Sequence, residues 1–334
     1  MRRPIVRSLA IVFGTSLVVT ALGAPSAVTP AAAAESDDAG AWHKLWHPAF
    51  RPSLGGGVEL RGAQWLGDRF AISGSDERGA VVWWSDDGVE WERTTQSTAT
   101  DHGVATSIAA GPDGYVMVGS QWTPTPRGRI WHSADGLEWD RAETRLPRDS
   151  DVSSVTSLAD GTFVVYGDNG RREGCWMGAS TDGGATWDFR WDGDWDPGSP
   201  GGCLTAVSRD AAGLLGRIDG NISESTDGVA WQELVSSEAI SEAFAQGTGA
   251  HHYLGLVPLD DGRYVLGRRG STTITWSRDG GVELDEDLID WTDLWRVDVA
   301  VGPERAVAVK YGMPAPLLSP PADAYTERWA RRGL

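Results

Sequence analysis

A short motif recurs five times along this chain and constrains its fold more than any other feature. Each copy has a serine, an aspartate two residues later and one or two glycines, and the first four copies end in tryptophan. The copies contain Ser85, Asp87 and Trp91; Ser133, Asp135 and Trp139; Ser180, Asp182 and Trp187; Ser225, Asp227 and Trp231; and Ser277 and Asp279, with Leu284 in place of tryptophan. Successive aspartates are 48, 47, 45 and 52 residues apart. A near-constant period of this length indicates a repeat architecture.

The motif is interpreted as a tight turn between two strands. Apolar runs such as Ala80–Trp84 and Thr273–Trp276 precede it. The aspartate carboxylate can accept hydrogen bonds from backbone N–H groups of the turn, and glycine tolerates the positive φ that such turns need. The tryptophan then begins the next strand and offers a large apolar surface to a neighbouring sheet. We therefore expect structural, not catalytic, roles for the repeated aspartates and tryptophans.

The rest of each period contains two more strand-like runs joined by a polar turn. In the second period, residues 106–110 and 115–119 flank the turn Gly111–Gly114. Short β-rich runs alternating with Gly/Asp turns predict antiparallel hairpins. Four strands in about 45 residues is the size of one propeller blade. The chain is therefore predicted to be all-β, a six-bladed β-propeller of four-stranded antiparallel blades, with seven blades as the alternative.

The six blades are predicted at residues 58–94, 103–144, 152–190, 203–234, 251–287 and 294–331. The last one lacks the motif, and its strands are expected at 295–299, 305–309 and 325–329. The segment Trp42–Trp46 resembles an outermost strand that precedes the first blade. It would either close the ring beside the last blade or be the remnant of a seventh blade. Closure matters because an open array leaves a long unpaired strand edge.

The first 34 residues have the layout of a secretory signal peptide. Arg2, Arg3 and Arg7 precede the apolar or small stretch Ser8–Ala24, and Ala32–Ala34 offers a small-x-small cleavage site. The predicted organisation is a signal peptide at 1–34, an N-terminal segment with the ring-closing strand at 35–57 and the propeller at 58–334. The apolar stretch is short for a membrane-spanning helix, so we expect a secreted, extracellular protein cleaved near residue 34. The paired arginines leave twin-arginine export as an alternative route.

Charge and cysteine content limit the partners. The chain has 29 Lys+Arg against 47 Asp+Glu, a net charge of −18, and cleavage would remove three arginines and no acidic residue. Such a chain lacks the basic surface that binds nucleic acid or an anionic membrane. The two cysteines, Cys175 and Cys203, are predicted to form a disulfide because the extracellular compartment is oxidising. We expect a monomer.

The motifs resemble those of the Asp-box, or BNR-repeat, proteins of the sialidase superfamily. Ser180–Trp187 matches the family pattern S/T-x-D-x-G-x-T-W in full, whereas the first, second and fourth copies lack one residue between glycine and tryptophan. The resemblance covers almost the whole chain after residue 34. It implies a propeller whose boxes lie between the third and fourth strands, away from the ligand face. Because the box occurs in sialidases, xyloglucan-degrading enzymes, sortilin-type receptors and photosystem assembly factors, it does not define an activity.

Sialidase activity would require a specific set of residues. The resemblance implies three arginines around a carboxylate, a Tyr–Glu nucleophile pair, an aspartate acid/base and a Phe/Tyr-Arg-Ile-Pro motif before the first blade. Phe50-Arg51-Pro52 lies at the corresponding place without the isoleucine. Arg51 is thus a candidate for the first arginine, and Tyr311 is a candidate nucleophile. No pattern identifies the remaining members of the set, so sialidase activity is not the favoured prediction.

Function is expected on the rim formed by the connections between blades and by the turns between second and third strands. Tryptophan beside carboxylate and guanidinium groups can stack on a sugar ring or anchor a protein partner. The candidate ligand-binding residues are Trp122, Arg127, Arg171, Arg172, Trp191, Asp194, Trp195, Arg268 and Trp291. The inter-blade carboxylates Asp101, Asp151, Asp192, Asp290 and Asp293 are candidates for glycoside hydrolysis.

One rim loop has a partial calcium-binding pattern. Asp192, Asp194 and Asp196 have the 1, 3, 5 spacing of an oxygen-ligand loop. The twelfth position is Cys203 instead of glutamate, so we expect no cofactor, with calcium as the alternative. The favoured function is a secreted propeller that binds a glycan or an extracellular protein without a definable catalytic set. The alternative is a glycoside hydrolase, sialidase-like or another exo-glycosidase, that uses rim carboxylates.

Overall fold

The structure, a computed structural model, consists almost entirely of antiparallel sheet. It describes residues 43–51, 57–94, 98–123, 125–144, 146, 150–168, 175–191, 204–210, 213–218, 221–245, 257–258, 263–269, 272–277, 281–286, 297–310 and 316–318. These residues form six sheets of four strands each, one 3-10 helix, η1 (Pro48–Phe50), and one α-helix, α1 (Ser237–Ala245). The predicted all-β architecture of four-stranded antiparallel sheets is therefore confirmed.

Five of the sheets are meanders in which each strand pairs with the next along the chain. The first contains β2 (Glu59–Trp65), β3 (Phe70–Ser75), β4 (Ala80–Ser85) and β5 (Glu92–Arg93), and the second contains β6 (Gly103–Gly111), β7 (Gly114–Thr123), β8 (Thr125–Ser133) and β9 (Asp140–Arg141). The third contains β10 (Asp151–Ser157), β11 (Phe163–Asp168), β12 (Cys175–Ser180) and β13 (Asp188–Trp191). The fourth contains β14 (Leu204–Asp210), β15 (Gly213–Ile218), β16 (Asn221–Ser225) and β17 (Gln232–Val235), and the fifth contains β18 (Val257–Pro258), β19 (Arg263–Arg269), β20 (Thr272–Ser277) and β21 (Gly281–Glu286).

The sixth sheet combines strands that are far apart in the sequence. Its order is β22 (Val297–Val301), β23 (Ala306–Lys310), β24 (Leu317–Leu318) and β1 (His43–Lys44). His43 lies opposite Leu318, and Lys44 lies opposite Leu317. The outermost strand of this sheet thus precedes the first sheet in the sequence. The strand expected at 325–329 lies outside the described residues.

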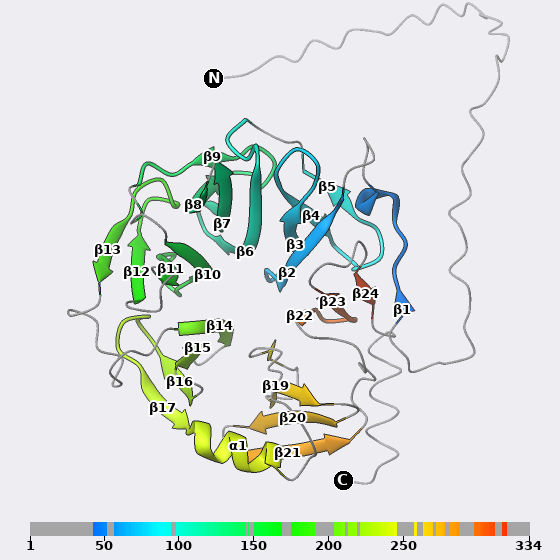
Figure 1. The fold of residues 1–334 in the computed structure, drawn as a ribbon, viewed down its shortest axis with the longest axis vertical. Helices are drawn as coiled ribbons and strands as arrows, with labels where there is room; N and C mark the ends of the chain where they lie inside the picture. Colours follow the sequence, from blue (N-terminus) through cyan, green and yellow to red (C-terminus); the bar gives the residue numbers. More distant parts are fainter. Residues whose placement is uncertain are drawn as a thin grey trace, which may run out of the picture. The chain divides into compact units, whose positions relative to one another are not determined.

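The sheets form a closed series. The first strands β2, β6, β10, β14, β18 and β22 contact one another in chain order, and β22 in turn contacts β2. Figure 1 shows these strands around a common centre, with the later strands of each sheet farther out. Every sheet therefore has a neighbour on both faces. This explains why strands such as β4, which is buried along its whole length, are continuous apolar runs.

The hydrophobic core lies between neighbouring sheets. Trp83, Trp131 and Trp176, all on third strands, are fully buried and pack among aliphatic side chains of the adjoining sheets. Burying an aromatic side chain of this size removes a large apolar area from water, at roughly 25 cal/mol per Å². The tryptophan-rich composition thus reflects the need to fill the space between neighbouring sheets.

Helix α1 was not predicted. It follows β17 in the connection between the fourth and fifth sheets, and the Ser236 hydroxyl accepts a hydrogen bond from the Ala239 N–H at 3.2 Å. A serine before the helix and Glu238 in its first turn are ordinary start signals for a helix. None of the helices in the described part of the chain is long and apolar enough to cross a membrane.

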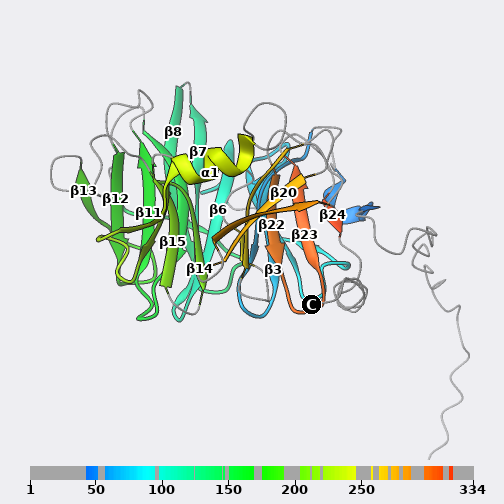
Figure 2. The same ribbon diagram turned by 90° about the horizontal axis from the view of Figure 1, so that it is seen from below.

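The meander topology places the connections at two opposite ends of the sheets. We call one end the connection rim: it carries the turn between the second and third strands of each sheet and the crossover to the next sheet. The opposite end carries the turns between third and fourth strands, where the repeated motif lies, and we call it the turn rim. Figure 2 shows the β7–β8 hairpin projecting beyond its neighbours at the connection rim. Strands β7 and β8 have 10 and 9 residues, whereas β3, β4, β11 and β12 have 6 each.

Candidate functional site

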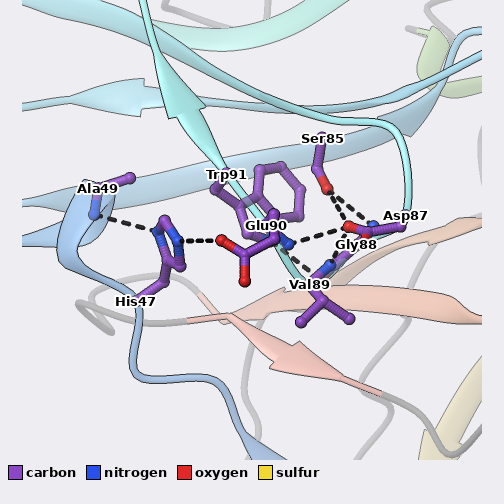
Figure 3. A network of polar contacts seen from close by, with 8 residues as sticks. All are labelled: His47, Ala49, Ser85, Asp87, Gly88, Val89, Glu90 and Trp91. Carbon is purple, nitrogen blue, oxygen red and sulfur yellow. Dashed lines mark hydrogen bonds and ion pairs between the residues drawn. The ribbon is translucent and has the colours of Figure 1, made fainter. Parts of the chain in front are cut away.

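The repeated motifs form turns in which one carboxylate oxygen of the aspartate accepts hydrogen bonds from the serine hydroxyl and from backbone N–H groups of the same turn. In Figure 3, the Ser85 hydroxyl donates to Asp87 Oδ1 at 3.1 Å, and the same oxygen accepts from the N–H groups of Val89 and Glu90 at 2.8 and 2.9 Å. The Gly88 N–H donates to Ser85 Oγ at 2.7 Å. The copies at Ser133 and Ser225 repeat this pattern, and the longer copy at Ser180 bonds Asp182 to Thr186 instead.

Hydrogen bonds of this kind favour the ionised carboxylate. The side-chain hydroxyl and backbone N–H of Thr186 lower the pKa of Asp182 to about 2. Burial opposes ionisation of Asp87, but the N–H groups of Glu90 and Val89, the Ser85 hydroxyl and the charge of Arg305 together lower its pKa. These acids stay charged at neutral pH and stabilise turns. Ser277 ends β20 and Asp279 lies outside the described residues, so the fifth copy is not described as a turn.

The turns also connect neighbouring sheets. The Trp84 indole N–H donates to the carbonyl of Gly136, in the turn of the next sheet, at 3.1 Å. In the fourth sheet, the Gly228 carbonyl accepts from the Tyr166 hydroxyl of the third sheet at 3.4 Å. The first turn lies beside the N-terminal segment, where His47 Nε2 is 3.2 Å from a Glu90 carboxylate oxygen (Figure 3).

Only part of the predicted site lies within the described chain. Arg171, Arg172, Asp192, Asp194, Trp195, Asp196, Cys203, Asp290, Trp291, Asp293 and Tyr311 lie outside it. Trp122, Trp191 and Arg268 are placed by their backbones in β7, β13 and β19. Arg51 is exposed directly after η1. Cys175 is disulfide-bonded.

Two of the predicted carboxylates lie at the connection rim. Asp151 begins β10 and lies directly opposite Asp168 at the end of β11. Burial, and then the charge of Asp168, raise the pKa of Asp151. Asp101 lies in the crossover between the first two sheets, and its carbonyl accepts a hydrogen bond from Gln121 Nε2 at 2.6 Å. Among the described residues, no three His, Cys, Asp or Glu side chains are grouped closely enough to hold a metal ion.

The β7–β8 hairpin assembles a cluster of guanidinium groups, which we call the arginine cluster: Gln121, Arg127, Arg129 and Arg141. Arg127, Arg129 and the buried Trp131 are two residues apart along β8 and therefore share one face of the sheet. Arg141 of β9 lies opposite Trp131. Gln121 lies opposite Arg127. The pleat of the sheet therefore sends all four side chains to one face.

Gln121 anchors this cluster. It is 7 % exposed, and its carboxamide oxygen accepts from Arg129 Nε and Arg141 Nη2, both at 2.9 Å. Arg129 also donates from Nη1 to the carbonyl of Gly128 at 3.0 Å. Burial, and then the charges of Arg141 and Arg127, lower the pKa of Arg129. The cluster thus concentrates positive charge on a chain with a net charge of −18.

A strained residue lies in the crossover at this part of the rim. His102 has φ = 56°, and no other non-glycine residue in the described ranges has positive φ. Its N–H donates to the carbonyl of Arg78 at 2.9 Å, which holds the crossover against the turn before β4. Residues in this left-handed region are uncommon, although histidine adopts it more readily than most.

The sequence predicted Arg127 as a site residue but not Gln121, Arg129, Arg141 or Asp168. The signal for Arg129 was available, because residues two apart in a strand share a face and Arg127, Arg129 and Trp131 are spaced in this way. Arg141 depends on the pairing of β9 with β8, which a single sequence does not show.

Comparisons with known proteins bear on the fold. No protein family model and no curated protein matches the chain. Among solved structures, the chain is similar to a gluconolactonase from Xanthomonas campestris, with 13 % sequence identity and a TM-score of 0.50 over 83 % of this chain and 94 % of that one. It is also similar to regucalcin, a calcium-binding protein from Agrobacterium tumefaciens, with 10 % identity and a TM-score of 0.50 over 84 % of this chain and 93 % of that one.

The chain is a β-propeller. Closed rings of four-stranded antiparallel sheets define this architecture, and the two solved structures share it. At identities of 10 to 13 %, the likeness concerns the fold of the propeller alone. Neither neighbour is described as a sialidase, so these comparisons do not extend the resemblance to that superfamily.

Proposed function

We propose that the chain is a secreted, six-bladed propeller of the Asp-box type that binds a glycan at the connection rim of its second blade. The observation that carries this proposal is the arginine cluster on one face of the second sheet, whose β7–β8 hairpin projects beyond its neighbours. Guanidinium groups are rich in N–H donors, and sugar hydroxyls and ring oxygens are acceptors. Trp122 lies in the same hairpin, between Gln121 and Arg127.

The architectural part of the proposal rests on two observations. Six blades are supported by the six sheets of the described residues and by the contact between β22 and β2. Four turns share the Ser–Asp–backbone hydrogen bonds that give the Asp-box pattern its physical meaning. Secretion rests on the sequence of residues 1–34, and its test is the N-terminal sequence of protein recovered from culture medium.

Glycan binding is tested with the chain from residue 35 on an array of neutral and acidic oligosaccharides. Positive ligands are then titrated calorimetrically against the wild type and the variants Arg127→Ala and Lys44→Gln. We expect Arg127→Ala to weaken binding about tenfold, because a hydrogen bond to a charged donor is worth about 1.5–3 kcal/mol. Lys44→Gln removes a charge from the sixth blade and should bind normally. An array with no specific ligand, or binding that Arg127→Ala leaves unchanged, contradicts the proposal.

A second candidate function is hydrolysis, which the pair Asp151 and Asp168 favours. Burial, and then the charge of Asp168, raise the pKa of Asp151, and a carboxyl group with a raised pKa beside a second carboxyl group is a recurrent acid/base arrangement. One structural neighbour is named a gluconolactonase, so sugar lactones and chromogenic glycosides are the substrates to test. If the pair is catalytic, Asp151→Asn lowers turnover by about 10²–10⁴-fold, whereas Asp113→Asn, at an exposed aspartate of the second blade, leaves it near wild type. Equal activity in both variants excludes this assignment.

Calcium is the candidate cofactor. The loop residues Asp192, Asp194 and Asp196 have the spacing of oxygen ligands, and the Agrobacterium neighbour is described as calcium-binding. If this loop binds calcium, the ion raises the Tm of the wild type and EDTA reverses the increase. The triple Asp→Asn variant then shows no such response.

A further inference from the structure

We propose that the arginine cluster is a binding site for a single planar carboxylate, carried by an acidic sugar such as a uronic acid. Only the identity of the carrier rests on the proposed function. The site itself is argued from three observations on the second blade.

The first observation is the number of donors. Three guanidinium groups hold fifteen N–H donors, and three of these are used in the hydrogen bonds to Gln121 and Gly128. Arg127 is exposed and uses none in the described part of the chain. Within the described residues, the other N–H groups of these arginines form no hydrogen bond and can bind a ligand or solvent.

The second observation is that no carboxylate of the described residues forms an ion pair with the cluster. Three other arginines of the described chain lie beside carboxylates: Arg61 with Glu59 at 2.7 Å, Arg69 with Asp68 at 3.7 Å, and Arg93 with Asp76. No described carboxylate forms an ion pair with Arg127, Arg129 or Arg141. Like charges held together repel, and the neutral Gln121 orients two of them without compensating their charge. An anionic ligand would relieve this repulsion.

The third observation concerns the shape and number of anionic groups. Guanidinium forks bind carboxylates through two parallel hydrogen bonds, and the buried Gln121 holds two of the three forks in defined orientations. The net charge of −18 repels polyanions over the whole surface. The ligand is therefore expected to carry one carboxylate on an otherwise neutral molecule, unlike a heavily sulfated polymer.

The test uses sodium D-glucuronate as the probe and glucose as its uncharged match, at constant ionic strength. Binding is followed by calorimetry and by chemical shifts of arginine side-chain N–H groups. Saturable binding of glucuronate, with none of glucose, supports the site. Arg127→Ala and Arg141→Lys should each weaken it about tenfold, because a charge-assisted hydrogen bond or the bidentate fork is lost. Lys44→Gln should leave it unchanged.

The variant Gln121→Glu places a carboxylate of the chain itself where the ligand carboxylate would bind. It adds a negative charge beside Arg129 and Arg141 and removes the hydrogen bond to the Asp101 carbonyl. We expect a protein that is folded by circular dichroism and no longer binds glucuronate. Glucuronate binding equal in wild type and Gln121→Glu overturns the site, as does tighter binding of inorganic sulfate than of glucuronate.

The outcomes separate this site from the proposed function. Glucuronate binding with an empty glycan array leaves the carboxylate site standing and removes glycan recognition. Glycan binding that Arg127→Ala and Gln121→Glu do not alter overturns the site and leaves recognition to another part of the rim.

Discussion

Asp298 of the sixth blade accepts a hydrogen bond from the backbone N–H of Ala63 in the first blade, with 3.1 Å between Oδ2 and the nitrogen. The Gln64 side chain donates to the same oxygen at 3.2 Å. Burial nevertheless outweighs these bonds and raises the pKa of Asp298 to about 6. The junction that closes the ring therefore contains a carboxyl group that titrates near neutrality.

Asp298→Asn should reduce the pH dependence of stability. Because the folded pKa of about 6 lies above the ordinary value of 3.8, the stabilisation from protonated Asp298 is complete below pH 3.8 and is lost as the pH rises through 6. Asparagine stays neutral and keeps an acceptor oxygen. The Tm of the variant relative to wild type should thus be higher at pH 7 than at pH 4. A difference that does not change with pH contradicts this, and Asp113→Asn, an exposed site in the second blade, is the control.

Asp182→Asn should show the opposite pH dependence. Thr186 lowers the pKa of Asp182 to about 2, so its contribution to stability is present above pH 3.8 and disappears as the pH falls through 2. We expect a lower Tm for the variant at pH 7 and a vanishing difference near pH 2. The effect is small because Asp182 is exposed. Thr186→Val should lower the Tm at neutral pH in the same direction.

Phe50→Ala should strongly destabilise the junction between the N-terminal segment and the first blade. Phe50 is 3 % exposed, and its ring centroid lies 5.6 Å from that of Trp83 and 5.5 Å from that of Trp91. Truncating a buried phenylalanine costs about 3–5 kcal/mol in the free energy of unfolding, measured by urea denaturation. Trp46→Ala is the comparison, because Trp46 is 67 % exposed and should lose less than about 1 kcal/mol. Similar losses at both sites would show that the segment is not part of the core.

Gly228→Ala should destabilise the fourth repeated turn. Gly228 has φ = 72°, and an L-residue in this region costs about 1–2 kcal/mol. An added Cβ would also lie 3.1 Å from the Tyr166 hydroxyl, which bonds to the Gly228 carbonyl. Gly57→Ala serves as the control, because nothing lies within 4 Å of a Cβ there. Urea unfolding should separate the two variants, and equal midpoints would refute the strain argument.

The repeated motif predicted the sheets well because it is a local signal. Its aspartate, glycine and tryptophan specify a turn and the start of a strand within a few residues, and the four described copies form the turns that this chemistry requires. Helix α1 was not predicted because the whole repeat was assigned to strands and turns. Ser236 and Glu238 are nevertheless ordinary helix-start residues.

The candidate site was harder to predict because it depends on pairing across strands. Arg127 was predicted from its position in a loop-like stretch, whereas its alignment opposite Gln121, with Arg141 added from β9, is a property of strand register. The pair Asp151 and Asp168 illustrates the same limit. The two residues are seventeen positions apart in the sequence and become neighbours only through the β10–β11 register.

The pairing of β1 with β24 sets the order in which the molecule can be completed. His43 and Leu318 are 275 positions apart in the sequence. A polypeptide emerging from a ribosome or a translocation channel therefore cannot complete the sixth sheet until its C-terminal strand has emerged. The entropic cost of joining such distant segments grows only logarithmically with their separation. The free-energy cost of pairing β1 with β24 last is therefore small. Truncation that removes either β1 or β24 disrupts the same strand pair. Proteolysis in an exposed crossover between sheets leaves β1 and β24 paired.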